Sequence, residues 1–167
     1  MKMTALVAGM ENTFLSQDGL SLLKLEGAVI HLKDSNFNLD QKVVYLVGDG
    51  NISNKAIAPF SDIVCELLAD ISIALMKHKD ARDYPDLIAF SFWCRKANLT
   101  ILRKRFYQAN QIRLGRGIVF HVTPSNVPVN FAFSLCFGLI AGNSNVVRVS
   151  SKHMPQVDII CAVINTL

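Results

Sequence analysis

The sequence lacks the motifs that mark several common kinds of functional site. No Cys-x-x-Cys pair and no His-x-x-x-His spacing occurs, so we expect no metal site. We also expect no secretory signal, because Glu11 ends the short apolar patch of residues 1–10. The four cysteines each lie in an apolar run and are Cys65, Cys94, Cys136 and Cys161. Free thiols without a signal peptide predict a reducing, cytoplasmic location.

Charged residues are scarce and apolar residues are abundant. Of the 167 residues, 18% are charged and 51% are hydrophobic, a balance that excludes a disordered chain. Nine glycines and five prolines are too few for a collagen-like or low-complexity protein. The length suffices for about one domain with a real core.

No charged residue occurs between residues 117 and 147, a stretch long enough to cross a bilayer. Turn clusters at residues 123–128 and 142–145 interrupt it, and in lipid they would leave backbone groups unpaired. We therefore expect a buried unit of a soluble protein and no membrane span. A membrane-associated protein that uses this stretch is the less favoured alternative.

The basic residues are concentrated in one part of the chain, although the net charge is only +4. The cluster comprises Arg95, Lys96, Arg103, Lys104, Arg105, Arg113 and Arg116. The simplest interpretation is the solvated face of a helix. Contact with an anionic cofactor is one alternative. A nucleic-acid patch is another, which the mild overall charge disfavours.

The first 60 residues predict an accessory region that contains β-strands. Residues 1–21 are weakly patterned and predict a frayed or accessory start. Alternating β-branched residues predict strands over residues 22–32 and 41–47, separated by a polar run.

Helical patterns follow. Ser61 is a candidate N-cap, and apolar residues at four-residue spacing predict a helix over residues 61–79. Pro85, near a first turn, predicts a second helix that runs from residue 84 to about residue 105.

The last third has the most regular pattern, that of a βαβ unit. The order is strand 118–122, loop 123–128, helix 129–141 and strand 145–149, followed by a helix that begins at Pro155. We expect Gly142 and Asn143 to end the middle helix as a C-cap. In such a unit the strands are parallel and buried on both faces, which explains the missing charges. The predicted class is α/β.

Ligands of open parallel sheets bind where the carboxyl ends of the strands meet. Two loops leave such ends, residues 123–128 and 148–152, and they form the candidate site on geometry alone. The Gly-x-Gly-x-x-Gly dinucleotide fingerprint is absent, because Gly115 and Gly117 precede the strand instead of following it.

Two runs in this region resemble a known family. They are residues 115–135, Gly-Arg-Gly-Ile-Val-Phe-His-Val-Thr-Pro-Ser-Asn-Val-Pro-Val-Asn-Phe-Ala-Phe-Ser-Leu, and residues 138–148, Gly-Leu-Ile-Ala-Gly-Asn-Ser-Asn-Val-Val-Arg. Both closely resemble the fatty acyl-CoA reductases typified by LuxC of bacterial bioluminescence, and residues 92–99 resemble an upstream segment of that family. The resemblance is dense over about residues 84–160 and thinner before them.

More distantly, the same region is similar to the aldehyde dehydrogenase superfamily, in which a Pro-Trp-Asn-Phe-Pro loop follows a strand. Residues 124–128 read Pro-Ser-Asn-Val-Pro, so Ser125 stands in place of the Trp. The resemblance implies that residues 61–167 form the first part of a nucleotide-binding domain with a Rossmann-like parallel sheet, incomplete in this chain.

The resemblance also implies an activity. A long-chain fatty acyl-CoA, or an acyl-protein, would be reduced to the aldehyde with NADPH through a Cys acyl-enzyme. An acyl-activating partner protein and an oligomeric complete enzyme are further expectations.

Specific residues take roles through this resemblance. Asn126 matches the oxyanion-stabilising Asn of the superfamily, whose amide donates to an oxygen as it gains charge. Without the resemblance, Asn126 is a turn former between two prolines. Thr123, Pro124 and Ser125 are expected to contact the cofactor, mainly through the backbone.

Arg148 matches the Lys that contacts the cofactor's adenosine ribose, and its guanidinium could hold a 2′-phosphate bidentately. Ser151 stands about where NAD-using relatives carry a Glu, and losing that carboxylate favours NADP(H); Lys152 assists. The alternative for Arg148 is a surface charge at a strand end.

The catalytic Cys of the family lies downstream of the βαβ unit, in a separate domain. None of the four cysteines takes its position, so we nominate no nucleophile. We expect the chain to be an N-terminal portion that is inactive alone. The alternative is a stand-alone cofactor-binding or regulatory protein without catalysis.

Overall fold

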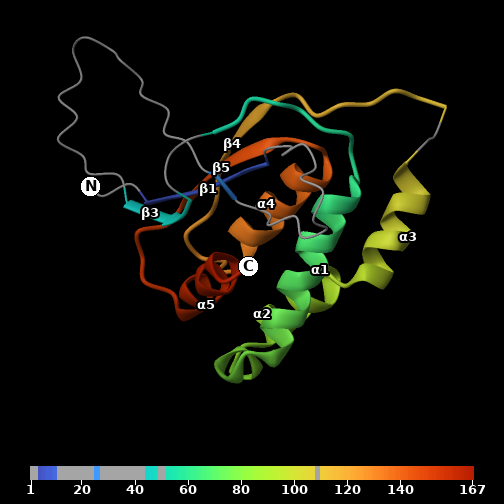
Figure 1. Ribbon diagram of the computed structural model, residues 1–167. Helices are drawn as coiled ribbons and strands as arrows, with labels where there is room; N and C mark the ends of the chain where they lie inside the picture. Colours follow the sequence, from blue (N-terminus) through green and yellow to red (C-terminus); the bar gives the residue numbers. More distant parts are fainter. Residues whose placement is uncertain (1–3, 11–24, 27–43, 49–51, 108–109) are drawn as a thin grey trace, which may run out of the picture.

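The computed structural model describes residues 4–10, 25–26, 44–48, 52–107 and 110–167 (Figure 1). The strands are β1 (Thr4–Met10), β2 (Leu25–Glu26), β3 (Val44–Val47), β4 (Ile118–Val122) and β5 (Ser144–Val149). The helices are α1 (Asp62–Lys77), α2 (Pro85–Trp93), α3 (Lys96–Phe106), α4 (Asn130–Ile140) and α5 (Pro155–Asn165), with a 3-10 helix η1 (Lys79–Asp83) between α1 and α2.

The predicted strand–helix–strand unit is present. β4 and β5 pair in parallel, with Phe120 opposite Val146, and α4 connects them. The α/β class is therefore confirmed. The sheet is mixed, however, because β1 pairs antiparallel with the other edge of β5. β3 then pairs parallel and β2 antiparallel with β1, which leaves β4 at the edge of the described sheet (Figure 1).

The expectation of a frayed start is wrong for residues 4–10. Thr4 to Ala8 pair with Val149 to Asn145 and occupy the centre of the sheet. The pairing partner lies far along the chain, so local pattern carried no sign of it. Of the predicted strand 22–32 only β2 is described, and of the strand 41–47 only β3; the other residues of both lie outside the described ranges.

The predicted helix over residues 84–105 is two helices. Arg95 has an extended backbone (ψ 141°) between α2 and α3. The side-chain amide of Asn98 donates to the Trp93 carbonyl at 2.7 Å, which satisfies a carbonyl at the end of α2. α1 begins after Ser61 as predicted, but the Ser61 hydroxyl is buried and finds no hydrogen-bond partner among the described residues.

α4 ends as the sequence predicts. Gly142 has φ +84°, and its N–H donates to the carbonyl of Leu139 in the last turn at 2.8 Å. The N–H of Asn143 donates to the carbonyl of Gly138 at 3.0 Å. These two bonds form a Schellman motif, whose left-handed residue favours glycine.

The core lies between the helices and one face of the sheet. Val147 and Val149 are buried there with side chains of α1, α4 and α5. On the opposite face Val146 packs against Tyr45 and Ile52. The expectation that the strands are buried on both faces is wrong for β4, whose apolar side chains Ile118, Phe120 and Val122 are exposed. β4 is an edge strand, and alternate residues face away from the helix layer.

Within the described residues, no helix combines the length and the apolar character needed to cross a bilayer.

Candidate functional site

A polar cleft of about 490 Å³ lies where β4 and β5 end. The side chains that line it are Thr123, Ser125, Arg148, Ser150, Ser151 and Lys152. The two loops that the sequence predicts as the site therefore meet in space. Five of the lining residues are candidates named from the sequence.

Thr123 joins the two strand ends. Its side chain is buried, and its hydroxyl donates to the Arg148 carbonyl at 2.9 Å. Its backbone N–H also points to that carbonyl, at 3.4 Å. Beyond the strand, the Lys152 N–H donates to the Ser150 hydroxyl at 3.1 Å and shapes the second loop. Local hydrogen bonds thus hold both walls of the cleft in register.

The cleft has the chemistry of an anion site. Arg148 and Lys152 supply positive charge, Ser125, Ser150 and Ser151 supply hydroxyl donors, and no carboxylate lines it. Arg148 is half-buried at the end of β5, where its charge is less screened than on an open surface. Guanidinium and hydroxyl groups of this kind suit phosphate oxygens.

Two of the sequence candidates do not line the cleft. Pro124 and Asn126 lie on the same loop with exposed side chains. The Asn126 amide forms no hydrogen bond with the described residues, so its N–H groups can donate to a ligand.

Sequence reasoning included Ser150 in the candidate loop 148–152 but gave it no role of its own. It also missed a polar pair behind the strands. The buried Asn145 side chain donates to the Asn143 carbonyl at 2.8 Å, and its Oδ1 lies 2.9 Å from His121 Nε2. Because Oδ1 accepts, His121 Nε2 carries the proton. Nothing in the local pattern distinguishes this pair from ordinary strand residues.

None of the four cysteines lines the cleft. Cys94 and Cys136 are buried with their sulfur atoms 4.0 Å apart, and burial raises the pKa of the Cys136 thiol well above its ordinary value. Burial likewise raises the pKa of Cys161 to about 12. Such thiols hold their protons and are poor nucleophiles.

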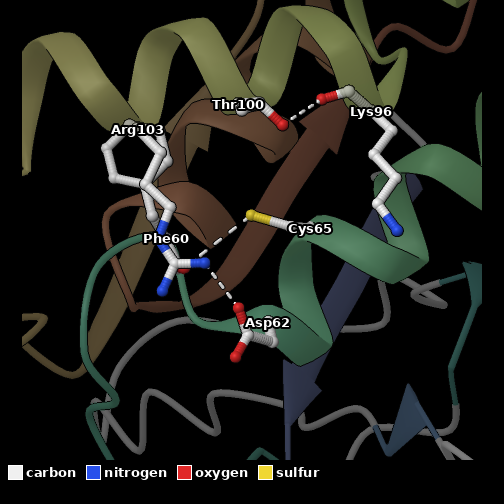
Figure 2. A network of polar contacts seen from close by, with 6 residues as sticks. All are labelled: Phe60, Asp62, Cys65, Lys96, Thr100 and Arg103. Atoms are coloured by element: carbon white, nitrogen blue, oxygen red, sulfur yellow. Dashed lines mark hydrogen bonds and ion pairs between the residues drawn. The ribbon is translucent and has the colours of Figure 1, made fainter.

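Cys65 lies in a second cavity of about 620 Å³ between α1 and α3. Figure 2 shows its sulfur directed at the Phe60 carbonyl, while Arg103 forms an ion pair with Asp62 across the two helices. Burial raises the pKa of the Cys65 thiol, and Arg103 partly opposes that shift. No histidine lines this cavity, and the raised pKa keeps the Cys65 thiol protonated.

The described residues contain no group of three or more His, Cys, Asp or Glu side chains that could hold a metal ion.

Comparison with known proteins bears on the same part of the chain. The model of the family described as acyl-CoA reductase (LuxC) matches residues 95–165, which confirms the resemblance over that region. The matched segment runs from the start of α3 to the end of α5 and contains both loops of the cleft. No curated protein and no solved structure matches the chain.

Proposed function

We propose that the chain supplies the cofactor-binding part of an acyl-CoA reductase of the LuxC kind, which reduces a fatty acyl-CoA to the aldehyde with NADPH. The observation that carries the proposal is the convergence of Arg148, Ser151 and Lys152 with Thr123 and Ser125 in one cleft, inside the segment that matches the family. A Rossmann-like cofactor domain of the aldehyde dehydrogenase type is part of the same proposal.

The cleft fits a cofactor with an extra phosphate. NADPH would supply a hydride when bound, and the residues of this chain would bind and orient it. The Arg148 guanidinium would hold the 2′-phosphate bidentately, and Lys152 would add a second positive charge. Ser151 favours the same cofactor, because a carboxylate at that position would repel the phosphate.

Asn126 is proposed to donate to the thioester oxygen of the substrate. Its exposed, unpaired amide on the loop beside the cleft is consistent with this role. In comparable enzymes, removing one such donor costs about 2.7–4 kcal/mol of transition-state stabilisation. Asn126→Ala is accordingly expected to lower aldehyde formation about 100- to 1000-fold in an assembled enzyme, at unchanged NADPH affinity.

The four thiols favour a second candidate for the isolated chain. Three are buried, and the fourth lies outside the cleft with a raised pKa, so the chain alone would bind cofactor without catalysis, as a regulatory or binding protein. Incubation with NADPH and myristoyl-CoA tests what the two candidates share, which is that the purified chain alone forms no aldehyde. Aldehyde formed by the purified chain would contradict the assignment of the nucleophile to another polypeptide segment.

Isothermal titration of the chain with NADPH and with NADH tests the proposal. We expect NADPH to bind at least 10-fold more tightly than NADH, since charge-assisted bonds to the 2′-phosphate are available to NADPH alone. Arg148→Ala should remove most of that difference. Arg116→Ala changes an exposed cation outside the cleft and should leave it intact. Equal affinities in the unmodified chain would refute the NADPH assignment.

A further inference from the structure

The end of α3 and the segment after it expose large apolar side chains beside basic ones. We call residues 101–107 and 110–116 the basic tip. Ile112 is 98% exposed, Leu114 is 65% exposed and Ile101 is 63% exposed. Figure 1 shows that α3 forms one side of the molecule and that the chain after it loops outward before it returns to β4. None of these three side chains lines the cleft at the ends of β4 and β5 or the cavity beside Cys65.

The base of the basic tip is held firmly. The Gly115 N–H donates to the Ile57 carbonyl at 3.0 Å, and the Arg116 N–H donates to Asn143 Oδ1 at 2.6 Å. A side chain built on Gly115 would lie 2.0 Å from the Gly142 carbonyl oxygen, so the backbone segments meet closely here. Ile112 and Leu114 precede this anchor by three residues and one residue.

Basic residues dominate the sequence around these side chains. No Asp or Glu occurs between residues 87 and 157, a stretch that holds nine Lys and Arg residues. Within the described part of the chain, ion pairs join Arg103 to Asp62 and His153 to Asp158. Lys104, Arg105 and Arg116 form none there.

An aromatic pocket of about 380 Å³ lies next to the basic tip. α3 and the tip contribute Phe106, Tyr107 and Arg113 to it, and α2 and α4 contribute Trp93 and Phe137. The Arg105 guanidinium lies 5.4 Å from the centre of the Phe106 ring. The Arg103 guanidinium likewise lies 5.7 Å from the centre of the Tyr107 ring, so arginines and aromatic rings of the basic tip are in contact.

We propose that the basic tip docks this protein on the surface of an anionic lipid bilayer. Apolar side chains that project from a basic face insert at the boundary of headgroups and acyl chains, while the cations meet anionic headgroups. A nucleic acid would take the positive charge, but it offers no apolar layer for Ile112 and Leu114. A second copy of the chain would bring its own positive face against this one, which is unfavourable. The aromatic pocket gives an acyl chain a place beside the insertion point.

This inference is independent of the proposed cofactor site. The basic tip and the cleft share no residue, so nucleotide binding and membrane binding can fail separately.

Sedimentation with lipid vesicles tests the proposal. The chain is mixed with vesicles of phosphatidylcholine, or of phosphatidylcholine and phosphatidylglycerol in a two-to-one ratio. We expect binding to the anionic vesicles that weakens with added salt, and little binding to the neutral ones. Lys104→Gln with Arg105→Gln should lower the partition coefficient about five-fold for each cation removed. Ile112→Ser with Leu114→Ser should lower it at least 10-fold, because two exposed side chains lose their insertion energy.

Matched variants on other surfaces are the controls. Ile73→Ser removes an exposed apolar side chain from α1, and Arg82→Gln removes an exposed cation from η1. Both should leave vesicle binding unchanged, and circular dichroism checks that every variant folds. Absence of binding to anionic vesicles, equal binding to neutral ones, or unchanged binding by the tip variants overturns the proposal. The proposal is also overturned if the unmodified chain binds no vesicles but binds DNA or dimerises, and the tip variants abolish that DNA binding or dimerisation.

Discussion

Substitution of Gly138 by Ala tests how closely α4 packs against β5. A Cβ at this position would lie 1.8 Å from Asn145 Oδ1 and 2.6 Å from its Cγ. The Asn145 side chain is fully buried and must move by more than an ångström to restore ordinary contact. It would then lose its bond to the Asn143 carbonyl and the one from His121.

The two losses set the size of the effect. Each buried polar group left without a partner costs about 1–3 kcal/mol. Replacing a glycine inside a helix by alanine stabilises the helix by about 1 kcal/mol, which offsets part of this cost. The net expectation is a destabilisation of about 3 kcal/mol, which lowers the melting temperature by roughly 6–12 °C for a chain of this size.

Thermal and urea denaturation of Gly138→Ala measure this change. The double variant with Asn145→Ala is the control, since it removes the side chain that the new methyl group would strike. It should be no less stable than Asn145→Ala alone, which gives a coupling energy close to the cost of the single variant. If Gly138→Ala is neutral or stabilising, the close packing of α4 on Asn145 is refuted.

Three further predictions follow from the buried thiols and the end of α4. Titration of the native chain with a thiol reagent at pH 8 should modify Cys65 alone, because the other three thiols are buried. Arg103→Gln should slow that reaction, because the Arg103 charge lowers the pKa of Cys65. Rapid reaction of two thiols would contradict this prediction. Since the pKa of Cys161 is raised from 9.0 to about 12, the folded chain keeps a proton that the unfolded chain loses. Stability should therefore fall as the pH rises from 9 toward 12, and Cys161→Ala should reduce the slope by about 1.4 kcal/mol per pH unit in urea denaturation. Gly142→Ala should destabilise the chain by at least about 1 kcal/mol in the same assay. The reason is that φ at this residue is +84° and a Cβ would lie 2.1 Å from the Ile57 carbonyl oxygen. An unchanged denaturation midpoint would contradict this prediction and show that the turn can relax.

The parts of the fold that local signals specify could be predicted from the sequence. The unit β4–α4–β5 has two short apolar strands around an apolar helix, and the Gly142–Asn143 stop is local. The two loops of the cleft could be predicted because the carboxyl ends of neighbouring parallel strands lie at the same edge of a sheet. That rule requires no knowledge of other contacts.

The remainder depends on contacts between distant residues. β1 is a central strand because β5 offers its free edge to Thr4–Ala8, more than 100 residues away in sequence. The break before α3 is supported by Asn98 reaching back to Trp93, a bond that hydrophobic periodicity does not register. The exposure of Phe120 depends on which side of the sheet the helices cover. Ser150 enters the cleft through the fold of its loop, so its position between two candidates was the only signal.

The central claim is that the cleft at the ends of β4 and β5 binds the 2′-phosphate end of a nucleotide cofactor. The most direct measurement is a two-dimensional amide NMR titration of the isotopically labelled chain with 2′-AMP, which carries the phosphate without the nicotinamide. The account predicts that the largest shift changes fall on residues 123–126 and 148–152, and that Arg148→Ala abolishes them. Changes that fall instead on the basic residues 103–116, or that survive Arg148→Ala, would contradict it.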